Sequence, residues 1–540
     1  MGGRKNGANL RVEFTAEEAD AGTRLDVFLA GRLADRGISR SKIQSRIKAG
    51  QVQVDNESVL SPKFKLDPGS QVCFESEEAE PGVRAVAGDV KIVFRDECLL
   101  VVDKAAGLTV HPAPGETGPT LVNHLVHEIP ELAALDPERP GIVHRIDKDT
   151  SGLMVVALDD KTRLDMARMF AERKVDKAYL AICFGSPKPS RGRLDAEIAR
   201  DPSNRTRMTA VKSGGREALS EYETLWTAPD GGFSLLKVAI KTGRTHQIRV
   251  HLADAGHPLA GDRVYGPREN AEMERQRGVD VPGRQMLHAW RLGFSHPGTG
   301  RAMRFGSRPP QDFMEFLFEL ARRPLRIGVV GSPGSGKSVL AGLLKELDVE
   351  VFSADACVAE LYKAGADGAG LIAGRFGGRF NDPSGAVDKK GLFRAMQEDD
   401  AVRREVIDLI HPLVKHRLRE FWREHSSEPL LAAEIPLLLE AGWQDRELVD
   451  LIVCVTAPDF LRAERLAKAR GWDEETAARM ESWQWPQDKK AAGSDIVMDN
   501  SGDLKDLGRR VAGLHVSLLA EARERNEARR AELEELTDPG

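Results

Sequence analysis

The sequence predicts a multidomain protein: a small α+β module, then a mixed α/β domain, then a C-terminal α/β domain with a parallel sheet. Two observations favour several domains. The chain has 540 residues, a length that corresponds to about three or four domains of ordinary size. An apolar run from Leu325 to Val330 leads directly into GSPGSGKS, a phosphate-binding pattern that requires a strand before it and a helix after it. Because a new domain begins near residue 325, the long sequence upstream must fold separately.

The composition is that of a protein with several cores and a mildly acidic surface. A hydrophobic share of 41% is sufficient for buried cores. The net charge of -6 argues against a chain coated throughout with nucleic acid, but it allows a local basic face. The five cysteines form no C-x-x-C pair, which disfavours zinc sites and a disulfide framework and favours a cytoplasmic location. We find no signal peptide and no apolar stretch of membrane-spanning length, so we expect no membrane partner.

The first 80 residues are expected to form a compact module of two helices followed by short strands. We place the helices at 25–33 and 41–48. Basic side chains outnumber acidic ones across this pair, and such an excess supplies the phosphate attraction that RNA binding requires. A solvated basic face without a ligand is the alternative from charge alone. The candidate RNA-binding residues are Arg24, Arg40, Lys42, Arg46 and Lys48.

The same module resembles a known RNA-binding family. The segments RLDVFL, GISRSKIQSRIKAGQVQVDN and LDPGSQV are similar to the alpha-L type RNA-binding domain found in a ribosomal small-subunit protein. The resemblance implies that residues 1–80 bind structured RNA. Residues 76–90 are acidic and then rich in Gly, Ala and Pro, which indicates a linker.

A loop with several ionisable and hydroxyl residues, GIVHRIDKDTSG, precedes the apolar strand LMVVA. Loops that a rigid strand positions often carry catalytic residues. Taken alone, the pattern also fits a structural turn in which Asp147 or Asp149 caps backbone N–H groups.

HRIDKDTSGLMVVA resembles the catalytic motif of the ribosomal large-subunit pseudouridine synthase family, whose usual form is HRLDxxTSG. Further matches occur in the family's order: VVDKAAGLTVHP, KAYL, KTGRTHQIRVHL with GHPLAGDRVYG, and LHA with FSHP. We identify residues 90–308 as a member of this family, which implies a mixed α/β domain with an antiparallel sheet that isomerises uridine in RNA, with rRNA as the expected class. Ile146 stands where leucine is usual and Ala105 where proline is usual, and neither change touches the expected chemistry.

The resemblance implies a role for four residues. Asp147 would be the catalytic carboxylate acting on a uridine flipped out of its stack. Arg145 would fill the gap left by the base, while Tyr179 would stack on the base and assist a proton transfer. Arg249 would pair with Asp147, holding its carboxylate ionised and oriented. No cofactor or metal is expected in this half, and three histidines are expected to orient or support the site: His144, His246 and His251.

The GSPGSGKS segment indicates a nucleotide site. Its glycines allow successive backbone N–H groups and the following helix N-terminus to face phosphates. Lys337 would reach the outer phosphates, and the Ser338 hydroxyl would bind Mg²⁺. A tight turn with a chance lysine is the alternative. The candidate nucleotide-binding residues are Gly334, Ser335, Gly336, Lys337, Ser338 and Val339.

Buried-type strands alternate with helical patterns beyond this loop, which predicts a parallel sheet. Residues 325–520 also resemble dephospho-CoA kinase in SAD, FGGRF, VDKKGLF, DLIHPLV, IPLLLEAGW, WPQDKKAAGSDIVMDN and GLHVSLLAEA. The resemblance implies transfer of a phosphoryl group from ATP, with Mg²⁺, to the 3'-hydroxyl of dephospho-CoA.

Asp355 is the candidate base and positioner of the kinase reaction, at the end of SAD. Ser353 stands where the family commonly has aspartate, and Val339 where it commonly has threonine. The first change predicts a lower kinase rate or metal affinity as one outcome. Three arginines would lie on a closing lid that neutralises transition-state charge, or would be surface residues of a helix: Arg462, Arg465 and Arg470.

The sequence as a whole predicts a fusion of two enzymes behind an RNA-binding module. Residues 521–540 are expected to be a charged helix that forms a solvated surface or a loose tail. Two alternatives remain: an RNA-binding or scaffold protein with one decayed catalytic half, and a kinase for another nucleoside-like acceptor. The target uridine, the oligomeric state and any coupling of the two activities are not encoded in a recognisable pattern.

Overall fold

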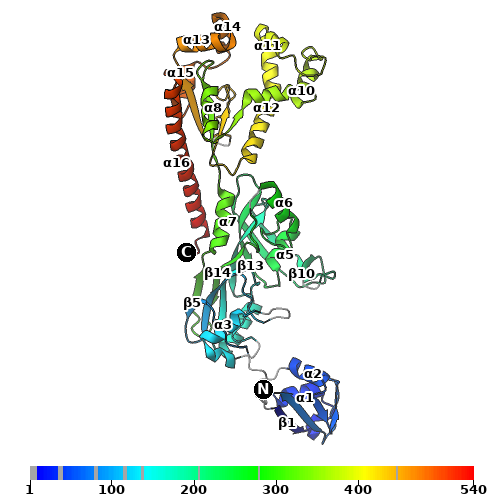
Figure 1. Cartoon of the computed structure of the whole chain (residues 1–540). Helices are drawn as coiled ribbons and strands as arrows, with labels where there is room; N and C mark the ends of the chain where they lie inside the picture. Colours follow the sequence, from blue (N-terminus) through cyan, green and yellow to red (C-terminus); the bar gives the residue numbers. More distant parts are fainter. Residues whose placement is uncertain are drawn as a thin grey trace, which may run out of the picture. The chain divides into compact units, whose positions relative to one another are not determined.

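The computed structural model describes residues 9–33, 40–77, 83–112, 118–135, 139–204, 207–277, 280–444 and 448–540. The chain divides into two compact units (Figure 1). The first comprises Met1–Met314 and Thr537–Gly540, and the second comprises Glu315–Leu536. The predicted fold class is confirmed: a small α+β module and a mixed α/β domain lie in the first unit, and a parallel α/β domain forms the second.

The N-terminal module packs two helices on a four-stranded antiparallel sheet with strand order β1-β4-β2-β3. Its core contains Leu25 and Leu29 of the first helix, Ile43 and Ile47 of the second, and Phe74 of the last strand, all fully or almost fully buried. The helices therefore face the sheet with one apolar stripe each. The elements are β1 (Asn9–Thr15), η1 (Glu18–Asp20), α1 (Leu25–Arg32), α2 (Arg40–Lys48), β2 (Val52–Val54), β3 (Glu57–Ser58) and β4 (Gln71–Glu77).

The rest of the first unit is built on a nine-stranded sheet with strand order β5-β6-β7-β14-β8-β13-β12-β9, and β15 pairs with β14. Its neighbours run antiparallel except for the parallel pair of β7 and β14. The strands are β5 (Lys91–Arg95), β6 (Leu99–Lys104), β7 (Ser151–Ala157), β8 (Asp176–Phe184), β9 (Arg191–Leu194), β12 (Ser220–Thr227), β13 (Phe233–Ile240), β14 (Leu287–Ser295) and β15 (Ala302–Gly306). A separate ribbon joins β10 (Glu197–Arg200) to β11 (Met208–Val211), and the helices are α3 (Leu121–Glu128), η3 (Pro130–Ala134), α4 (Asp160–Ala171), α5 (Gln247–Asp254) and α6 (Pro267–Arg277).

Close packing of β7 against β14 fixes the loop that precedes β7. Every residue of β7 is buried, and His288 of β14 pairs with Ser151 at the start of β7. Gly152 has φ +111°, and a Cβ there would lie 2.3 Å from the carbonyl oxygen of Ala289. Only glycine allows the two backbones to approach this closely. The loop that ends at Thr150 is therefore anchored on a rigid strand.

The second unit is a five-stranded parallel sheet with strand order β17-β18-β16-β19-β20. One face packs against α9 to α12, and the other packs against α8 and α16. The strands are β16 (Leu325–Val330), β17 (Glu350–Ser353), β18 (Leu430–Glu434), β19 (Leu451–Thr456) and β20 (Ile496–Asp499). Its helices are α8 (Lys337–Glu346), α9 (Ala354–Leu361), α10 (Asp367–Phe376), α11 (Lys389–Glu398), α12 (Asp400–Glu424), α13 (Asp459–Arg470), α14 (Glu474–Ser482), α15 (Gln487–Ala492) and α16 (Leu504–Thr537), and α7 (Gln311–Ala321) crosses the boundary between the units. Among the described residues, none of these helices combines the length and the apolarity needed to cross a membrane.

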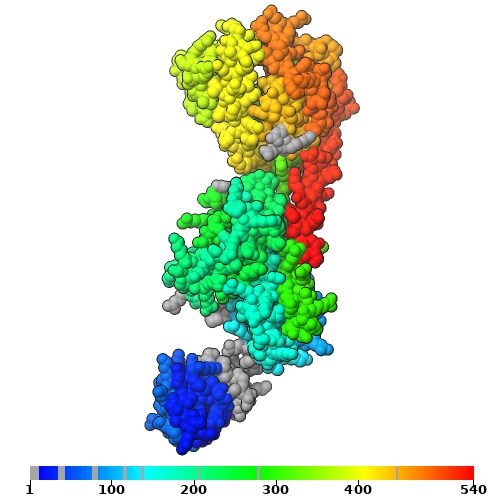
Figure 2. Space-filling view, turned by 180° about the vertical axis from the view of Figure 1, so that it is seen from behind, coloured from blue at the N-terminus to red at the C-terminus, as the bar shows by residue number. Residues whose placement is uncertain are grey.

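The C-terminal twenty residues differ from the loose or solvated tail expected for 521–540. They continue α16, whose earlier turns place Val511 and Leu518 on the sheet. Figure 2 shows these earlier, orange-red turns beside the orange part of the same unit. Ala522 and Leu533 are 3% and 1% exposed, so apolar residues at helical spacing bury one side of a highly charged helix. The last four residues belong to the first unit, where Trp290 Nε1 donates a hydrogen bond to the Thr537 carbonyl at 2.8 Å.

Candidate functional sites

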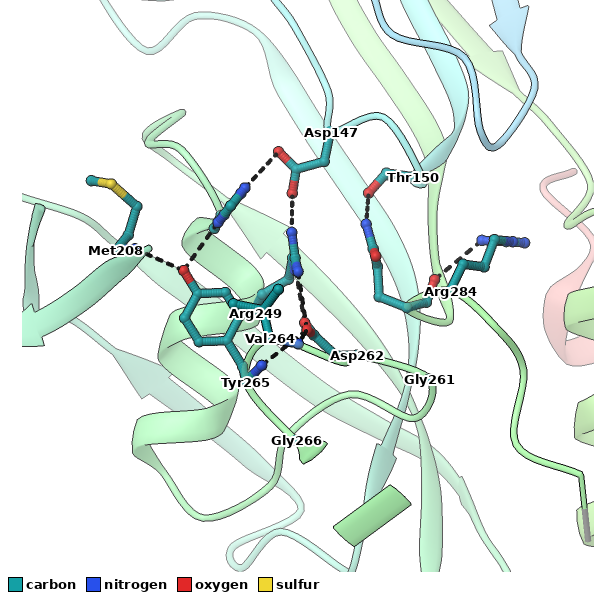
Figure 3. Close-up of polar contacts among 12 residues, drawn as sticks. Asp147, Thr150, Met208, Arg249, Gly261, Asp262, Val264, Tyr265, Gly266 and Arg284 are labelled. Atoms are coloured by element: carbon teal, nitrogen blue, oxygen red, sulfur yellow. Dashed lines mark hydrogen bonds and ion pairs between the residues drawn. The ribbon is translucent and has the colours of Figure 1, made fainter. Parts of the chain in front are cut away.

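A buried arginine holds the aspartate of the loop before β7. Arg249, in α5, donates from Nη1 to Asp147 Oδ2 at 3.3 Å (Figure 3). It also donates from Nε and Nη2 to the two carboxylate oxygens of Asp262, at 2.7 and 3.0 Å. Asp262 is fully buried, and the Arg249 side chain is 7% exposed. The guanidinium thus bridges two carboxylates, and the bidentate pair with Asp262 sets its position.

A second line of contacts reaches Asp147 through His246, the residue immediately before α5. His246 Nε2 lies 4.0 Å from Asp147 Oδ1, and His246 Nδ1 lies 3.0 Å from the Tyr265 hydroxyl. The backbone N–H of Met208 donates to the same hydroxyl at 2.9 Å. The phenol is therefore placed to donate its own proton to Nδ1, which leaves the Nε2 proton facing Asp147.

The charges of this cluster follow from its burial and pairing. Burial opposes the charged form of Arg249, but the hydrogen bonds and charge of Asp262, helped by Asp147, raise the pKa of Arg249 above its ordinary value. Burial lowers the pKa of His246, against the attraction of Asp147. Near pH 7 Asp147 therefore lies between a permanent cation and a neutral imidazole.

The four residues expected to act in this half line one cavity of about 340 Å³: Arg145, Asp147, Tyr179 and Arg249. Tyr179, in β8, is 7% exposed. Burial, and then the charge of Asp147, raises the pKa of Tyr179, so its phenol is neutral. Arg145 is exposed. The fold therefore brings the loop before β7, the strand β8 and the helix α5 to a single site.

A buried lysine holds the loop before β7 through its backbone. Lys104, at the end of β6, donates from Nζ to the carbonyl oxygens of Ala105, Leu108 and Lys148 at 2.7, 2.7 and 2.8 Å. Burial lowers the pKa of Lys104 to about 7, against the attraction of Asp149 and Asp147. Three carbonyl acceptors match the three N–H bonds of the protonated amine. The lysine therefore ties the loop before β7 to the end of β6.

We expect Asp262→Asn to lower the free energy of unfolding by about 3 kcal/mol, because it leaves the buried Arg249 charge with only its weaker partner. The matched control is Asp254→Asn, an exposed change on the same helix as Arg249, with an expected effect within about 0.5 kcal/mol. Chemical denaturation of both variants measures the difference. Equal stabilities would show that Asp262 does not anchor the arginine.

The phosphate-binding loop of the second unit lies between β16 and α8 as predicted. Gly331, Gly334 and Gly336 have φ values of +149°, +76° and +102°. A Cβ at Gly334 would lie 2.6 Å from the Arg462 carbonyl oxygen, and a Cβ at Gly336 would lie 2.2 Å from Asn500 Nδ2. The Asn500 amide in turn donates to the Ser335 carbonyl at 2.7 Å. The loop is therefore held in a conformation that only glycine can adopt at these positions.

The end of β18 presents an acid to this loop. Ser338 Oγ donates to Glu434 Oε1 at 2.5 Å, and Lys337 Nζ donates to the Ser332 carbonyl at 3.1 Å. Asp355 lies in the first turn of α9 rather than at the end of the strand, and its carboxylate attracts Lys337 electrostatically. Ser353, in place of the expected aspartate, caps α9 by accepting from the Ala356 N–H at 3.3 Å.

One cavity of about 880 Å³ collects most of the predicted kinase residues: Gly334, Gly336, Lys337, Ser338, Val339, Asp355, Arg465 and Arg470. Ser335 and Arg462 do not line it. Ser335 belongs to the phosphate-binding loop, and its side chain is fully buried. Arg462 is 5% exposed, and it donates to the Pro333 carbonyl at 3.2 Å and pairs with Asp459 and Glu481. Arg462 thus fastens α13 to the loop, while Arg465 and Arg470 face the cavity.

The residues that line this cavity fit a nucleoside triphosphate bound together with Mg²⁺. Among the described residues, the buried Arg465 Nη1 has no hydrogen-bond partner, and Arg465 lines the cavity, so this donor is available to a bound phosphate. Ser338 and Glu434 supply adjacent oxygen ligands of the kind that Mg²⁺ prefers. Lys337 and Arg470 add positive charge at the same cavity.

The basic residues of the N-terminal module do not form one uniform group. Arg24 and Arg40 both donate to the buried Asp26, with closest contacts of 2.9 and 3.0 Å. Burial would raise the pKa of Asp26, but hydrogen bonds from Arg24, Gln44 and Arg40 lower it to about 2. Arg46 donates to Gln51 at 2.8 Å, Lys48 is exposed, and the side chain of Lys42 lies outside what the structure describes.

Sequence reasoning missed four residues that organise these sites: Lys104, Asp262, Glu434 and Asn500. Lys104 and Asp262 lie within VVDKAAG and GDRVYG, which were noted only as family motifs. Glu434 ends an otherwise apolar strand, and this is the signal that could have placed an acid next to the phosphate-binding loop.

Three family models match successive parts of the chain. They describe an S4 domain at residues 23–72, an RNA pseudouridylate synthase at 98–254 and a dephospho-CoA kinase at 325–506. An uncharacterized RNA pseudouridine synthase of Aquifex aeolicus is 42% identical over 305 residues, which cover 56% of this chain and 94% of the relative. The ribosomal large subunit pseudouridine synthase D of Neisseria meningitidis serogroup B is 41% identical over 311 residues, or 57% of this chain and 81% of the relative. A solved dephospho-CoA kinase from Campylobacter jejuni aligns at 19% identity over 36% of this chain and 98% of its own, with a TM-score of 0.29, and adds no weight.

With the two cavities, these matches define an enzyme that has two catalytic domains and an RNA-binding module. The chain belongs to the RNA pseudouridine synthase family, and it carries a dephospho-CoA kinase domain in addition.

Proposed function

We propose that the protein is a bifunctional enzyme that converts uridine to pseudouridine in rRNA and phosphorylates the 3'-hydroxyl of dephospho-CoA with ATP. The observation that carries the first activity is the convergence of Asp147, Arg145 and Tyr179 on one cavity. The second activity is supported by the phosphate-binding loop, with Ser338 bonded to Glu434 beside a cavity of about 880 Å³.

In the synthase reaction the N-glycosidic bond of uridine breaks, a bond from C5 to the sugar forms, and a proton leaves C5 while N1 gains one. Asp147 acts on the flipped nucleoside. Arg249 keeps the Asp147 carboxylate directed into the cavity. Tyr179 is a neutral phenol, so it stacks on the base and relays a proton rather than acting as an anion. Exposed Arg145 fills the space that the base leaves in the RNA.

In the kinase reaction ATP supplies the phosphoryl group and Mg²⁺ neutralises its charge. The backbone of residues 334–336 and Lys337 hold the phosphates, while Ser338 and Glu434 hold the metal. Asp355 positions the acceptor hydroxyl and accepts its proton. Arg465 and Arg470 stabilise the charge that develops on the transferred group, and Arg462 keeps α13 against the loop.

ATP affinity is expected to fall as the pH rises above 8. Burial, with Lys490 nearby, lowers the pKa of Lys337 to about 8, although Glu434 and Asp355 oppose this shift. Phosphates bind the protonated amine, so deprotonation of the free enzyme raises the apparent Kd by up to about tenfold per pH unit. Lys337→Arg, which stays charged, should bind more weakly but with a flat profile from pH 8 to 9.5. If the Kd of the native enzyme for ATP did not change between pH 8 and 9.5, the lowered pKa of Lys337 would be contradicted.

The rRNA assignment is tested with unmodified transcripts labelled with tritium at uridine C5, because pseudouridine formation releases that hydrogen to water. We expect release from large-subunit rRNA and none from tRNA. Release from tRNA alone would support the synthase activity but would show that rRNA is not the substrate. Absence of release from both, with RNA still bound, would favour the alternative of a decayed catalytic half.

The acceptor is tested by supplying ATP and Mg²⁺ with dephospho-CoA or with adenosine-type nucleosides and measuring each phosphorylated product. We expect CoA as the main product. Phosphorylation of another nucleoside without CoA formation would support kinase activity but would show that dephospho-CoA is not the acceptor.

The domain boundaries at 1–80, 90–308 and 325–520 are part of the same proposal. The residues matched by the three family models, 23–72, 98–254 and 325–506, lie within these boundaries and support them. We also propose a cytoplasmic location, since the described cysteines are unpaired and the substrates of both reactions occur there.

A further inference from the structure

Lys177 is a half-buried cation of the synthase cavity, and no carboxylate among the described residues pairs with it. It lies in β8 two residues before Tyr179, and strand side chains alternate, so both side chains lie on the same face of the sheet. Lys177 Nζ donates one hydrogen bond, to the Thr242 carbonyl at 3.3 Å, and lies 5.5 Å from the centroid of the Phe170 ring. A protonated amine has three N–H bonds, so two remain for a ligand.

The charges that line this cavity favour an anionic ligand. Its cationic residues are Arg145, Lys177, Arg244 and Arg249. Among the described residues, the lining contains one carboxylate, Asp147, which Arg249 already pairs with. Burial, and then the charge of Lys241, lowers the pKa of Lys177 to about 8, so the amine is mostly protonated at pH 7. Because a desolvated cation without a counter-ion is costly, an anion bound at Lys177 is stabilised.

His144 supplies a second donor beside the same aromatic ring. Its Nε2 accepts a hydrogen bond from the Val155 N–H at 3.0 Å, so that nitrogen carries no proton. Burial, and then the charge of Lys177, lowers the pKa of His144 to about 3, so the imidazole is neutral and its one proton is on Nδ1. The ring lines the cavity and stacks on Phe170, with centroids 4.6 Å apart. In the part of the chain that the structure describes, no acceptor contacts Nδ1, so its N–H is also free for a ligand.

We propose that Lys177 and His144 bind a phosphodiester oxygen of the RNA beside the flipped uridine. This inference rests on the proposed synthase function. Phosphates are the anions of RNA, whereas the carbonyl groups of uracil are neutral and leave the Lys177 charge uncompensated. Lysine and neutral N–H groups are common donors to phosphate oxygens, and such contacts position the nucleic acid without reading its sequence.

The position of Lys177 on the strand fits one nucleotide. Tyr179 lies two residues further along β8, or about 7 Å, which is comparable with the span from a base to its phosphate. A base stacked on Tyr179 and a phosphate bound at Lys177 leave the sugar between them, in the cavity that Asp147 lines. The contact therefore holds the backbone of the flipped nucleotide and offsets part of the cost of unstacking the base.

Lys177→Met tests the contact, because methionine keeps an apolar stem beside Phe170 and removes the charge. No ion pair is lost, so its unfolding temperature should equal or exceed that of the native protein, and circular dichroism checks its fold. The matched control is Lys161→Met, an exposed lysine in the first turn of α4, about 14 Å along the helix from Phe170. A lower unfolding temperature in Lys177→Met alone would show that the lysine supports the fold, and would contradict the proposal.

The first readout is the affinity of the full-length protein for the large-subunit rRNA transcript at several salt concentrations. We expect Lys177→Met to bind more weakly and to reduce the slope of log Kd against log salt by about 0.7 to 0.9, as for one lost phosphate contact. Lys177→Arg and Lys161→Met should both keep the native slope. An unchanged slope in Lys177→Met would overturn the contact.

The second readout compares uridine with its 3'- and 5'-monophosphates as inhibitors of tritium release. The native protein should bind the preferred monophosphate about tenfold more tightly than uridine, and Lys177→Met should bind the two equally. His144→Gln keeps an acceptor for the Val155 N–H but lacks the Nδ1 donor, so this preference should fall by about threefold. If Lys177→Met weakened the binding of uridine and of the monophosphate by the same factor, the lysine would contact the base and the proposal would be wrong.

The two readouts separate this inference from the proposed function. RNA binding needs no turnover, so a reduced salt slope in Lys177→Met, without tritium release by the native protein, would support the phosphate contact and disprove the synthase activity. Tritium release with an unchanged salt slope and no preference for a monophosphate would support the synthase activity and overturn the contact.

Discussion

Replacing Asp147 with asparagine is expected to lower the rate of pseudouridine formation by at least about a thousandfold. Asparagine has nearly the same shape, and its amide can still contact Arg249, so the cavity should persist. What is lost is the negative charge of the Asp147 carboxylate. The carboxylate needs this charge whether it attacks the sugar covalently or removes a proton from the sugar. The measurement is tritium release from C5-labelled rRNA under single-turnover conditions, which separates the chemical step from RNA binding.

The matched control is Asp149→Asn, two residues further along the same loop. Asp149 contributes its backbone carbonyl to Arg284 at 3.0 Å and does not line the cavity. We expect this variant to keep its rate within about tenfold of native. CoA formation should be unchanged in both variants. A similar loss in both would indicate damage to the loop and not the removal of a catalytic group.

Replacing Lys337 with alanine is expected to reduce CoA formation by about a thousandfold while pseudouridine formation is retained. The lysine is the charge nearest to the phosphates in the proposed complex, and its loss leaves Arg465, Lys468 and Arg470 of α13 as the cationic side chains that line the cavity. Because the same contact acts on bound ATP and on the transition state, both KM and kcat should change. Initial rates over a range of ATP concentrations measure the two effects.

Lys345→Ala is the control for this variant, since Lys345 lies on α8 as well but is exposed and outside the cavity. It should have native rates. If Lys337→Ala retained most of its CoA formation, the proposed phosphate contact would be wrong. If both variants lost activity, an effect on α8 itself would explain the result.

Local patterns explain why so much of the site could be predicted from the sequence. GSPGSGKS predicts its strand, loop and helix because glycine geometry and lysine chemistry are contained in eight consecutive residues. HRIDKDTSG is likewise a single loop in front of a buried strand. The apolar periodicity of the N-terminal module predicted α1 and α2 within a residue or two of their observed ends.

Residues that act through long-range contacts were not predictable in the same way. Glu434 meets Ser338 across 96 positions, and only the pairing of β18 with β16 brings them together. Asp262 anchors Arg249 from a position 13 residues further along the chain, and the two side chains meet only in the folded structure. Arg462 is a residue whose role the sequence pattern did not predict correctly. Its spacing with Arg465 and Arg470 suggested that all three lie on one lid, but the Arg462 side chain is buried and contacts the Pro333 carbonyl.

The return of the last four residues to the first unit makes that unit discontinuous in sequence. Arg308 Nη2 donates to Asp538 Oδ2 at 3.0 Å, and Gly306 leaves room for Pro539, whose Cβ would lie 2.2 Å from a Cβ at that glycine. The kinase segment is thus an insertion between two pieces of the synthase unit, not an appendage behind it. A fragment cut after Met314 exposes Trp290 and leaves its indole N–H without an acceptor from the chain. Separate expression of the two halves should therefore restore the synthase fully only when residues 537–540 are supplied with it.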